Sequence, residues 1–131
     1  MHVLLIEDNA GDVLLIRQIL SGLPFSVKVS TALDGEQAAH LLADPEIKPD
    51  LIILDLNIPK IPGLALLARY KPAAQVVVFS SSSNENERKE AMNLGARQFV
   101  HKPLEMDEFA KAVTKIVQDW IRSRSAACGE A

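Results

Sequence analysis

The chain alternates between short apolar runs and longer segments of helical periodicity, and this alternation limits the folds that it can adopt. Four of the apolar runs are typical of strands that are covered on both faces. They lie at residues 3–6, 51–54, 76–79 and 99–100. Residues 26–32 alternate between polar and apolar side chains instead, as expected of a strand nearer the edge of a sheet. The sequence therefore predicts five strands.

The segments between these strands carry the signals of helices. Val13, Ile16 and Leu20 recur at the spacing of one helix face. Asp34 and Gln37 have the side-chain chemistry of a helix N-terminus, with a capping acid followed three residues later by a glutamine. The pattern therefore predicts a strand followed by a helix, repeated five times.

Strict alternation of strands and helices favours an α/β fold, in which right-handed crossovers join parallel strands and helices cover both faces. Five such units predict a flavodoxin-like (βα)5 doubly wound sheet with strand order 2-1-3-4-5. A length of 131 residues suits a single domain. We expect that domain to span residues 1–123 and residues 124–131 to form a short flexible C-terminal tail.

Composition excludes several classes of protein. A net charge of -3 gives no overall attraction to nucleic acid. No apolar run approaches the length of about 18 residues that a membrane helix requires. Cys128 is the single cysteine, so an intramolecular disulfide cannot form, as in a reducing compartment. We expect a cytoplasmic protein that binds neither nucleic acid nor membrane.

Polar side chains follow the predicted strands at the edge where function gathers in such sheets, namely the carboxyl ends of the strands. Glu7 and Asp8 follow the first strand, Asp55 the third, Ser80 the fourth and Lys102 the last. Strands 1 and 3 are neighbours in the predicted order, so their three carboxylates should converge. Such a group repels itself unless a cation holds it, and an open site built of oxygen ligands suits Mg²⁺.

This arrangement has a possible chemistry. The carboxylate of Asp55 can act as a nucleophile and accept a phosphoryl group as an acyl phosphate. The Lys102 ammonium would offset the charge of that group, and the Ser80 hydroxyl could donate to one of its oxygens. No glycine-rich phosphate loop follows the first strand, which argues against nucleotide binding.

Five motifs at matching spacings resemble the receiver domain of two-component response regulators. They are Glu7-Asp8-Asn9, Asp55 within LDLNIP, Ser80 after VVVF, NLGA at 93–96 and FVHKP at 99–103. The resemblance runs from about residue 2 to about residue 122. The segments IEDNAGDVLLI and LDLNIPKIPG are most similar to the single-domain regulators that partner bacterial phytochrome histidine kinases.

The resemblance implies that Asp55 is the phosphoacceptor, with a histidine kinase as donor. Glu7 and Asp8 would form the acidic pocket, with Asp8 the more direct Mg²⁺ ligand. The backbone carbonyl of Asn57 would be a further metal ligand. The expected function is therefore a Mg²⁺-dependent signalling switch, in phytochrome-type light signalling, rather than an enzyme.

The resemblance also assigns the residues that read out phosphorylation. Lys102 would contact the phosphoryl group, with a cis peptide bond to Pro103. Ser80 would be the switch hydroxyl and Phe99 the switch aromatic, which moves inward as Ser80 is drawn to the phosphoryl group. We expect the signal to leave through the surface of the fourth helix, fifth strand and fifth helix, without a DNA-binding domain. We also expect a homodimer, through an apolar stripe that reaches Trp120.

Two alternative functions remain open at this point. Phosphatases with an aspartate nucleophile typically carry a second aspartate two positions later, where this chain has Asn57. A pseudo-receiver would bind partners without phosphorylation. The presence of the complete set argues against a pseudo-receiver; that set is Glu7, Asp8, Asp55, Ser80 and Lys102.

Overall fold

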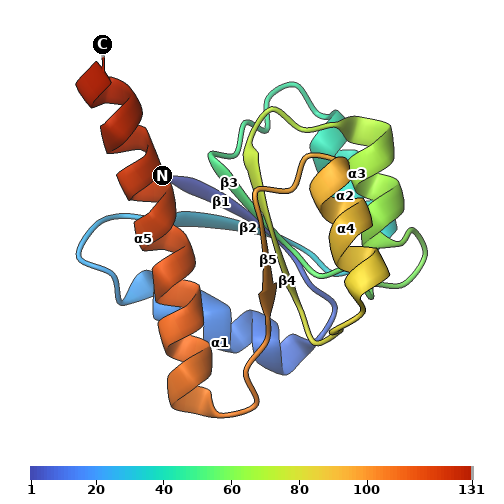
Figure 1. Ribbon diagram of the computed structural model, residues 1–131, viewed down its shortest axis with the longest axis horizontal. Coiled ribbons are helices and arrows are strands. Elements are labelled where there is room, and N and C mark those ends of the chain that lie inside the picture. Colours follow the sequence, from blue (N-terminus) through green and yellow to red (C-terminus); the bar gives the residue numbers. More distant parts are fainter. Residues whose placement is uncertain (131) are drawn as a thin grey trace.

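The computed structural model describes the backbone of residues 1–130 and the side chains of residues 1–124. Strands and helices alternate along the whole of it (Figure 1). The strands are β1 His2–Ile6, β2 Lys28–Ala32, β3 Leu51–Leu54, β4 Gln75–Ser80 and β5 Gln98–His101. The helices are α1 Ala10–Ser21, α2 Gly35–Ala43, α3 Gly63–Tyr70, α4 Glu85–Asn93 and α5 Met106–Glu130. This element order is the one that the sequence predicts.

The five strands form one parallel sheet in the order β2-β1-β3-β4-β5, so the predicted flavodoxin-like topology is confirmed. β2 lies at an edge of the sheet, as its alternating sequence indicates. In the β1–β3 pair, Ile6 lies opposite Leu54. The next residues, Glu7 and Asp55, therefore leave the sheet side by side at its carboxyl edge.

Two apolar cores lie on the two faces of the sheet. α1 and α5 cover one face, and α2, α3 and α4 cover the other (Figure 1). Neighbouring residues of a strand point to opposite faces. Val3 and Leu5 therefore pack with α1 and α5, whereas Leu4 and Ile6 pack with the other three helices. This double coverage explains why the strand runs are apolar without alternation.

The chain departs from our expectations at two places near its C-terminal end. The bond between Lys102 and Pro103 is trans, since the described residues contain no cis peptide bond, so the prediction of a cis bond is wrong. The two isomers before proline differ by only about 0.5–1 kcal/mol, so local packing decides between them. α5 continues past residue 123 to Glu130, and the flexibility of residues 124–131 stays a prediction. Within residues 1–130, every helix is too short or too polar to cross a lipid bilayer.

The start of α2 is fixed against the loop that joins β3 to α3. The Gly35 amide donates to the Pro59 carbonyl at 3.0 Å. A Cβ atom on Gly35 would lie 2.1 Å from the Ile61 carbonyl oxygen, far inside contact distance. Lys60, in the left-handed region at φ 73°, pairs with Asp34 at 3.5 Å. Close approach of the two backbones thus requires glycine at position 35, and the loop it holds begins beside the carboxyl edge of the sheet.

We predict that Gly35→Ala lowers the free energy of unfolding by roughly 2 kcal/mol, because the added methyl group must displace the backbone of the β3–α3 loop. Gly22→Ala is the matched control, since its Cβ would lie 3.6 Å from the nearest backbone oxygens, an ordinary contact. That variant should stay within about 0.5 kcal/mol of the wild type. Urea denaturation followed by circular dichroism measures both. Equal stabilities for the two variants would contradict the tight-contact interpretation.

Candidate functional site

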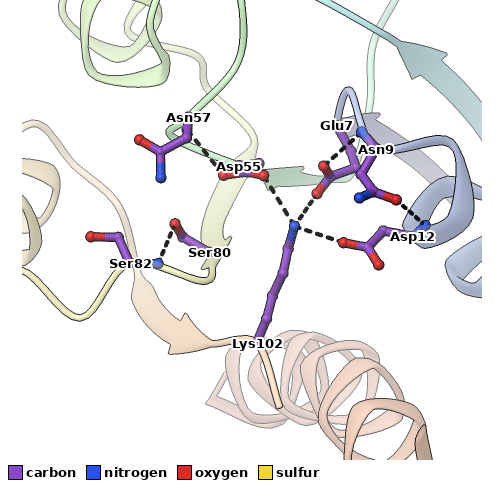
Figure 2. Close-up of polar contacts among 8 residues, drawn as sticks. All are labelled: Glu7, Asn9, Asp12, Asp55, Asn57, Ser80, Ser82 and Lys102. Atoms are coloured by element: carbon purple, nitrogen blue, oxygen red, sulfur yellow. Dashed lines mark hydrogen bonds and ion pairs between the residues drawn. The ribbon is translucent and has the colours of Figure 1, made fainter. Parts of the chain in front are cut away.

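An open cleft of about 500 Å³ lies at the carboxyl edge of the sheet. Residues of α1 and α5, and of the loops that follow β1, β3, β4 and β5, line this cleft. Its lining residues are Glu7, Asp8, Asn9, Asp12, Leu15, Asp55, Asn57, Ser81, Lys102, Pro103, Leu104, Met106 and Phe109. The cleft therefore gathers the predicted acids and the predicted lysine, and Figure 2 shows the polar contacts of Glu7, Asp55 and Lys102.

Asp55 lies at the floor of the cleft, directly after β3, with 6% of its surface exposed. Its backbone amide donates to the Ile6 carbonyl at 2.9 Å, which fixes the main chain. Carboxylate oxygen Oδ1 accepts the Asn57 amide at 3.0 Å, and Oδ2 accepts the Lys102 ammonium at 3.0 Å. The carboxylate is therefore held in one orientation by a contact to each oxygen.

Lys102 follows β5 and reaches across the cleft (Figure 2). Its backbone amide donates to the Ser80 carbonyl at 2.8 Å. Its ammonium donates to Glu7 Oε2 at 2.5 Å, and to Asp12 Oδ2 and Asp55 Oδ2 at 3.0 Å each. A lysine ammonium has three N–H donors, so each of the three carboxylates takes one. The side chain is 9% exposed, and each N–H of its ammonium has a carboxylate partner.

Negative charge exceeds positive charge around Lys102, because three carboxylates share its one ammonium. Burial raises the pKa of Glu7 to about 7, and the charge of Asp55 adds to the rise, while the hydrogen bond from Lys102 opposes it. Burial alone would lower the pKa of Lys102. The hydrogen bond to Glu7 and the charges of Glu7 and Asp55 outweigh that effect and raise the pKa above its usual value. Lys102 therefore remains a cation at neutral pH, whereas Glu7 titrates there.

The carboxylates fit a small divalent cation. One oxygen each from Glu7, Asp8 and Asp55 lies within 4.8 Å of the others. Among the described residues, this is the one group of acidic, histidine or cysteine side chains whose ligand atoms lie close enough together to share an ion. Asp8 is exposed to solvent, whereas Glu7 and Asp55 are buried. A hard donor set with one solvent-facing member is typical of a Mg²⁺ site that keeps bound water.

Ser80 and Phe99 lie outside this group of side chains. Ser80 is fully buried, and its hydroxyl oxygen accepts the Ser82 amide at 3.2 Å. In the described part of the chain, Ser81 rather than Ser80 lines the cleft. Phe99 is half-buried and packs on the core beneath α2, α3 and α4. The structure thus brings five predicted residues to the cleft and leaves the two predicted switch residues behind it.

Sequence reasoning missed Asp12. This residue lies in the first turn of α1 and contacts the Lys102 ammonium from the side opposite β3 (Figure 2). A signal was present in the sequence, because Asn9 caps the helix and accepts the Asp12 amide at 3.0 Å. An acid three residues after an N-cap, directly following strand 1, points back toward the carboxyl edge of the sheet.

The fold and the cleft can now be compared with known proteins. The family model described as the response regulator receiver domain matches residues 3–114. The chain belongs to this family. Over 106 residues, the receiver domain is 37% identical to protein-glutamate methylesterase/protein-glutamine glutaminase 3 of Geobacter sulfurreducens. The match covers 79% of the chain and 28% of that protein, so the chain spans less than a third of this relative.

Solved structures of response regulators resemble the receiver domain over nearly its whole length. The phosphorylated cyanobacterial phytochrome response regulator RcpA has a TM-score of 0.85 at 31% identity, over 93% of this chain and 94% of that one. The Mn²⁺-bound form of response regulator Rcp1 has a TM-score of 0.82 at 28% identity, over 91% of this chain and 93% of that one. The receiver domain is therefore similar both to a phosphorylated regulator and to one that binds a divalent metal.

The raised pKa of Glu7 predicts a pH-dependent contribution to stability. The folded form holds this proton up to about pH 7, and the unfolded form loses it near the ordinary value of 4.5. The stabilising contribution is therefore complete below pH 4.5 and is lost as the pH rises through 7. Relative to Glu7→Gln, we expect the wild type to lose on the order of 3 kcal/mol of unfolding free energy across this range in EDTA. Urea denaturation at several pH values measures the difference, and a flat difference curve would contradict the assignment.

Proposed function

We propose that this receiver domain is a signalling switch that accepts a phosphoryl group from a histidine kinase onto Asp55. The observation that carries this proposal is the placement of the Asp55 carboxylate, which lies at the floor of an open cleft and is oriented by Lys102 and Asn57. A carboxylate held in this way approaches a donor in one geometry, which lowers the entropic cost of reaction.

In the transfer itself, the reacting groups are the Asp55 carboxylate and the phosphorylated histidine of the donor. One oxygen of Asp55 attacks the phosphorus of a phosphohistidine, so that a P–O bond forms while the P–N bond breaks. The electron pair of the P–N bond stays on the imidazole nitrogen, and a donor ring that carries a proton on its other nitrogen leaves without further proton transfer. The products are an acyl phosphate and a neutral imidazole. The Lys102 ammonium, already beside Asp55 Oδ2, pairs with the negative charge of the phosphoryl oxygens.

Mg²⁺ is the proposed cofactor. Glu7, Asp8, Asp55 and the backbone carbonyl of Asn57 would hold it, and when bound it supplies positive charge beside the phosphoryl oxygens. Both oxygens of Glu7 already accept hydrogen bonds, one from Lys102 and one from the Asn9 amide at 3.1 Å. Asp8 is exposed and free of such contacts among the described residues, which supports it as the more direct ligand.

The rim of the cleft supports a protein partner. Leu104 and Met106 line the cleft and are fully exposed and 68% exposed, and Leu14, next to the lining residue Leu15, is 60% exposed. Exposed large apolar side chains beside a polar cleft are typical of a docking surface. RcpA, which is 31% identical, is a phytochrome response regulator. This similarity supports a bacterial phytochrome histidine kinase as the donor.

A set of hydrogen bonds supports the output route that we propose. The Ser82 amide donates to the Ser80 hydroxyl oxygen, and the Ser82 hydroxyl donates to Glu87 of α4 at 2.9 Å. If Ser80 turns toward a phosphoryl group on Asp55, its contact with Ser82 breaks and α4 loses part of its anchorage. Phe99, on β5 beneath α4, can then move inward. The altered surface would be that of α4, β5 and α5.

The direct test is incubation with acetyl phosphate and Mg²⁺, followed by measurement of intact mass. We expect wild-type protein to gain the mass of one phosphoryl group. Asp55→Asn should gain none, because it lacks the nucleophilic oxygen, and EDTA should abolish labelling of the wild type. Asp44→Asn is a matched control, since Asp44 follows α2 and does not line the cleft.

Each of the other outcomes would indicate a different function or a different acceptor residue. Labelling that persists in Asp55→Asn would remove Asp55 as the acceptor. No labelling of the wild type, together with partner binding unaffected by Asp55→Ala, would indicate a pseudo-receiver. Continuous release of phosphate from a phosphomonoester substrate would indicate a phosphatase.

We also propose a homodimer formed through α5. Trp120 and Ile121 pack partly on their own core, and the Trp120 indole donates to the Asp50 carbonyl at 3.0 Å. Beyond these contacts the C-terminal end of α5 stands clear of the sheet (Figure 1). Trp120 and Ile121 are only half-buried, and apolar side chains that stay partly exposed on a helix support association with a second copy. Light scattering at micromolar concentrations should therefore give the mass of two chains. The mass of one chain, with and without phosphorylation, would contradict the proposal.

A further inference from the structure

Asp12 takes no part in the phosphotransfer chemistry described above, although it lies in the same cleft. Its side chain is 28% exposed, and its Oδ2 atom lies 3.0 Å from the Lys102 ammonium. It is more exposed than Glu7 or Asp55 and comes from a helix rather than from the end of a strand. Lys102 therefore has a third carboxylate partner in addition to Glu7 and Asp55.

The contacts around Asp12 form a closed ring (Figure 2). Lys102 donates to Glu7 Oε2, and Glu7 Oε1 accepts the Asn9 amide. The Asn9 side chain accepts the Asp12 amide, and Asp12 Oδ2 accepts the Lys102 ammonium. Each residue in the ring therefore fixes the next, and the ring ties the ammonium to the start of α1 as well as to β1.

The number of N–H donors on Lys102 explains how this ring can orient the ammonium. The three N–H groups are shared among Glu7, Asp12 and Asp55. When an Asp55 oxygen becomes part of an acyl phosphate, one N–H must move from the carboxylate to a phosphoryl oxygen. Glu7 and Asp12 do not react, so they keep the other two. Two fixed contacts leave the third N–H one direction, which is toward Asp55.

We infer that Asp12 is a positioning residue, which acts through Lys102 to keep its ammonium beside Asp55 while the acceptor carboxylate becomes an acyl phosphate. This inference rests on the proposed function of Asp55. Without Asp12, one N–H of Lys102 turns to water, and only Glu7 holds the flexible four-carbon side chain beside Asp55. Asp12 does not touch the reacting atoms, so its effect should vanish when Lys102 is absent.

Two other roles for Asp12 make different predictions. An acid in the first turn of a helix stabilises the helix through its dipole, which affects unfolding but not the rate of phosphorylation well below the melting temperature. A negative charge at the cleft could instead repel an anionic phosphodonor, in which case its removal would speed phosphorylation whether or not Lys102 is present.

The kinetic test compares the rates at which acetyl phosphate labels the wild type and the variants in the presence of Mg²⁺. We expect Asp12→Ala to slow labelling about 3- to 10-fold. Asp12→Asn, which keeps an oxygen acceptor without the charge, should lie between Asp12→Ala and the wild type. Glu36→Ala, which removes a first-turn acid of α2 remote from the cleft, should label at the wild-type rate.

Removing Lys102 separates a positioning role from charge repulsion. In a Lys102→Ala background, Asp12→Ala should cause no further change in the labelling rate. Faster labelling in both backgrounds would identify repulsion and overturn the inference. An unchanged rate in the wild-type background, with lowered stability alone, would identify the helix-dipole role and overturn it as well.

A spectroscopic measurement decides the same point without phosphorylation. The ammonium of a fully paired lysine exchanges slowly with water, so the ¹⁵N–¹H signal of Lys102 should be visible in the wild type. It should be lost in Asp12→Ala and retained in Glu36→Ala. An unchanged signal in Asp12→Ala would overturn the inference. If the wild type shows this signal but never gains phosphate, the proposed function fails while the positioning contact stands.

Discussion

The ammonium group of Lys102 connects the parts of this receiver domain that lie at the carboxyl edge of the sheet. Its three ion pairs reach Glu7 after β1, Asp12 in α1 and Asp55 after β3, while its own backbone follows β5. Separating one member from such a buried group leaves an uncompensated charge, which costs several kcal/mol. The polar side chains at this edge are therefore held to one another by charge, and their arrangement can respond when that charge changes.

The excess of carboxylates over ammonium groups explains the character of the site. One cation cannot neutralise Glu7, Asp8, Asp12 and Asp55, and the charge of Asp55 adds to the rise in the pKa of Glu7 that burial causes. A divalent cation relieves this repulsion, and a phosphoryl group beside the ammonium redistributes it. The site thus holds several carboxylates close together in a cleft that is open to solvent. Both properties suit a phosphorylation switch better than a rigid binding pocket.

The strands and the loop that support the site are held in different ways. β1 and β3 are covered on both faces, and their apolar side chains hold Glu7 and Asp55 at fixed positions. The loop after β4 is held by hydrogen bonds through Ser82, which links Ser80 to α4. Polar contacts of this kind exchange more easily than packed side chains. The proposed acceptor therefore sits on the rigid part of the domain, and the proposed switch sits on the part that can rearrange.

Much of the site was visible in the order of residues along the chain. Uninterrupted apolar runs placed the strands, and the acids and the lysine that follow them marked the carboxyl edge, because the side chains after parallel strands all meet there. Asp55, Glu7, Asp8 and Lys102 were therefore identified correctly as neighbours. The close backbone contact at Gly35 was not identified from the sequence, because the approach of Ile61 to Gly35 follows from the packing of two distant segments.

By itself, the sequence determined the element order, the strand order and the residues at the functional edge, because these follow from periodicity and from the rules of parallel sheets. Only the tertiary structure decided which acids share the ammonium, that Asp12 is one of them, that Ser81 rather than Ser80 lines the cleft and that Pro103 follows a trans bond. These features depend on distances of a few ångströms between segments far apart in the chain. Local patterns carry no record of such distances, since they arise from the way the elements pack.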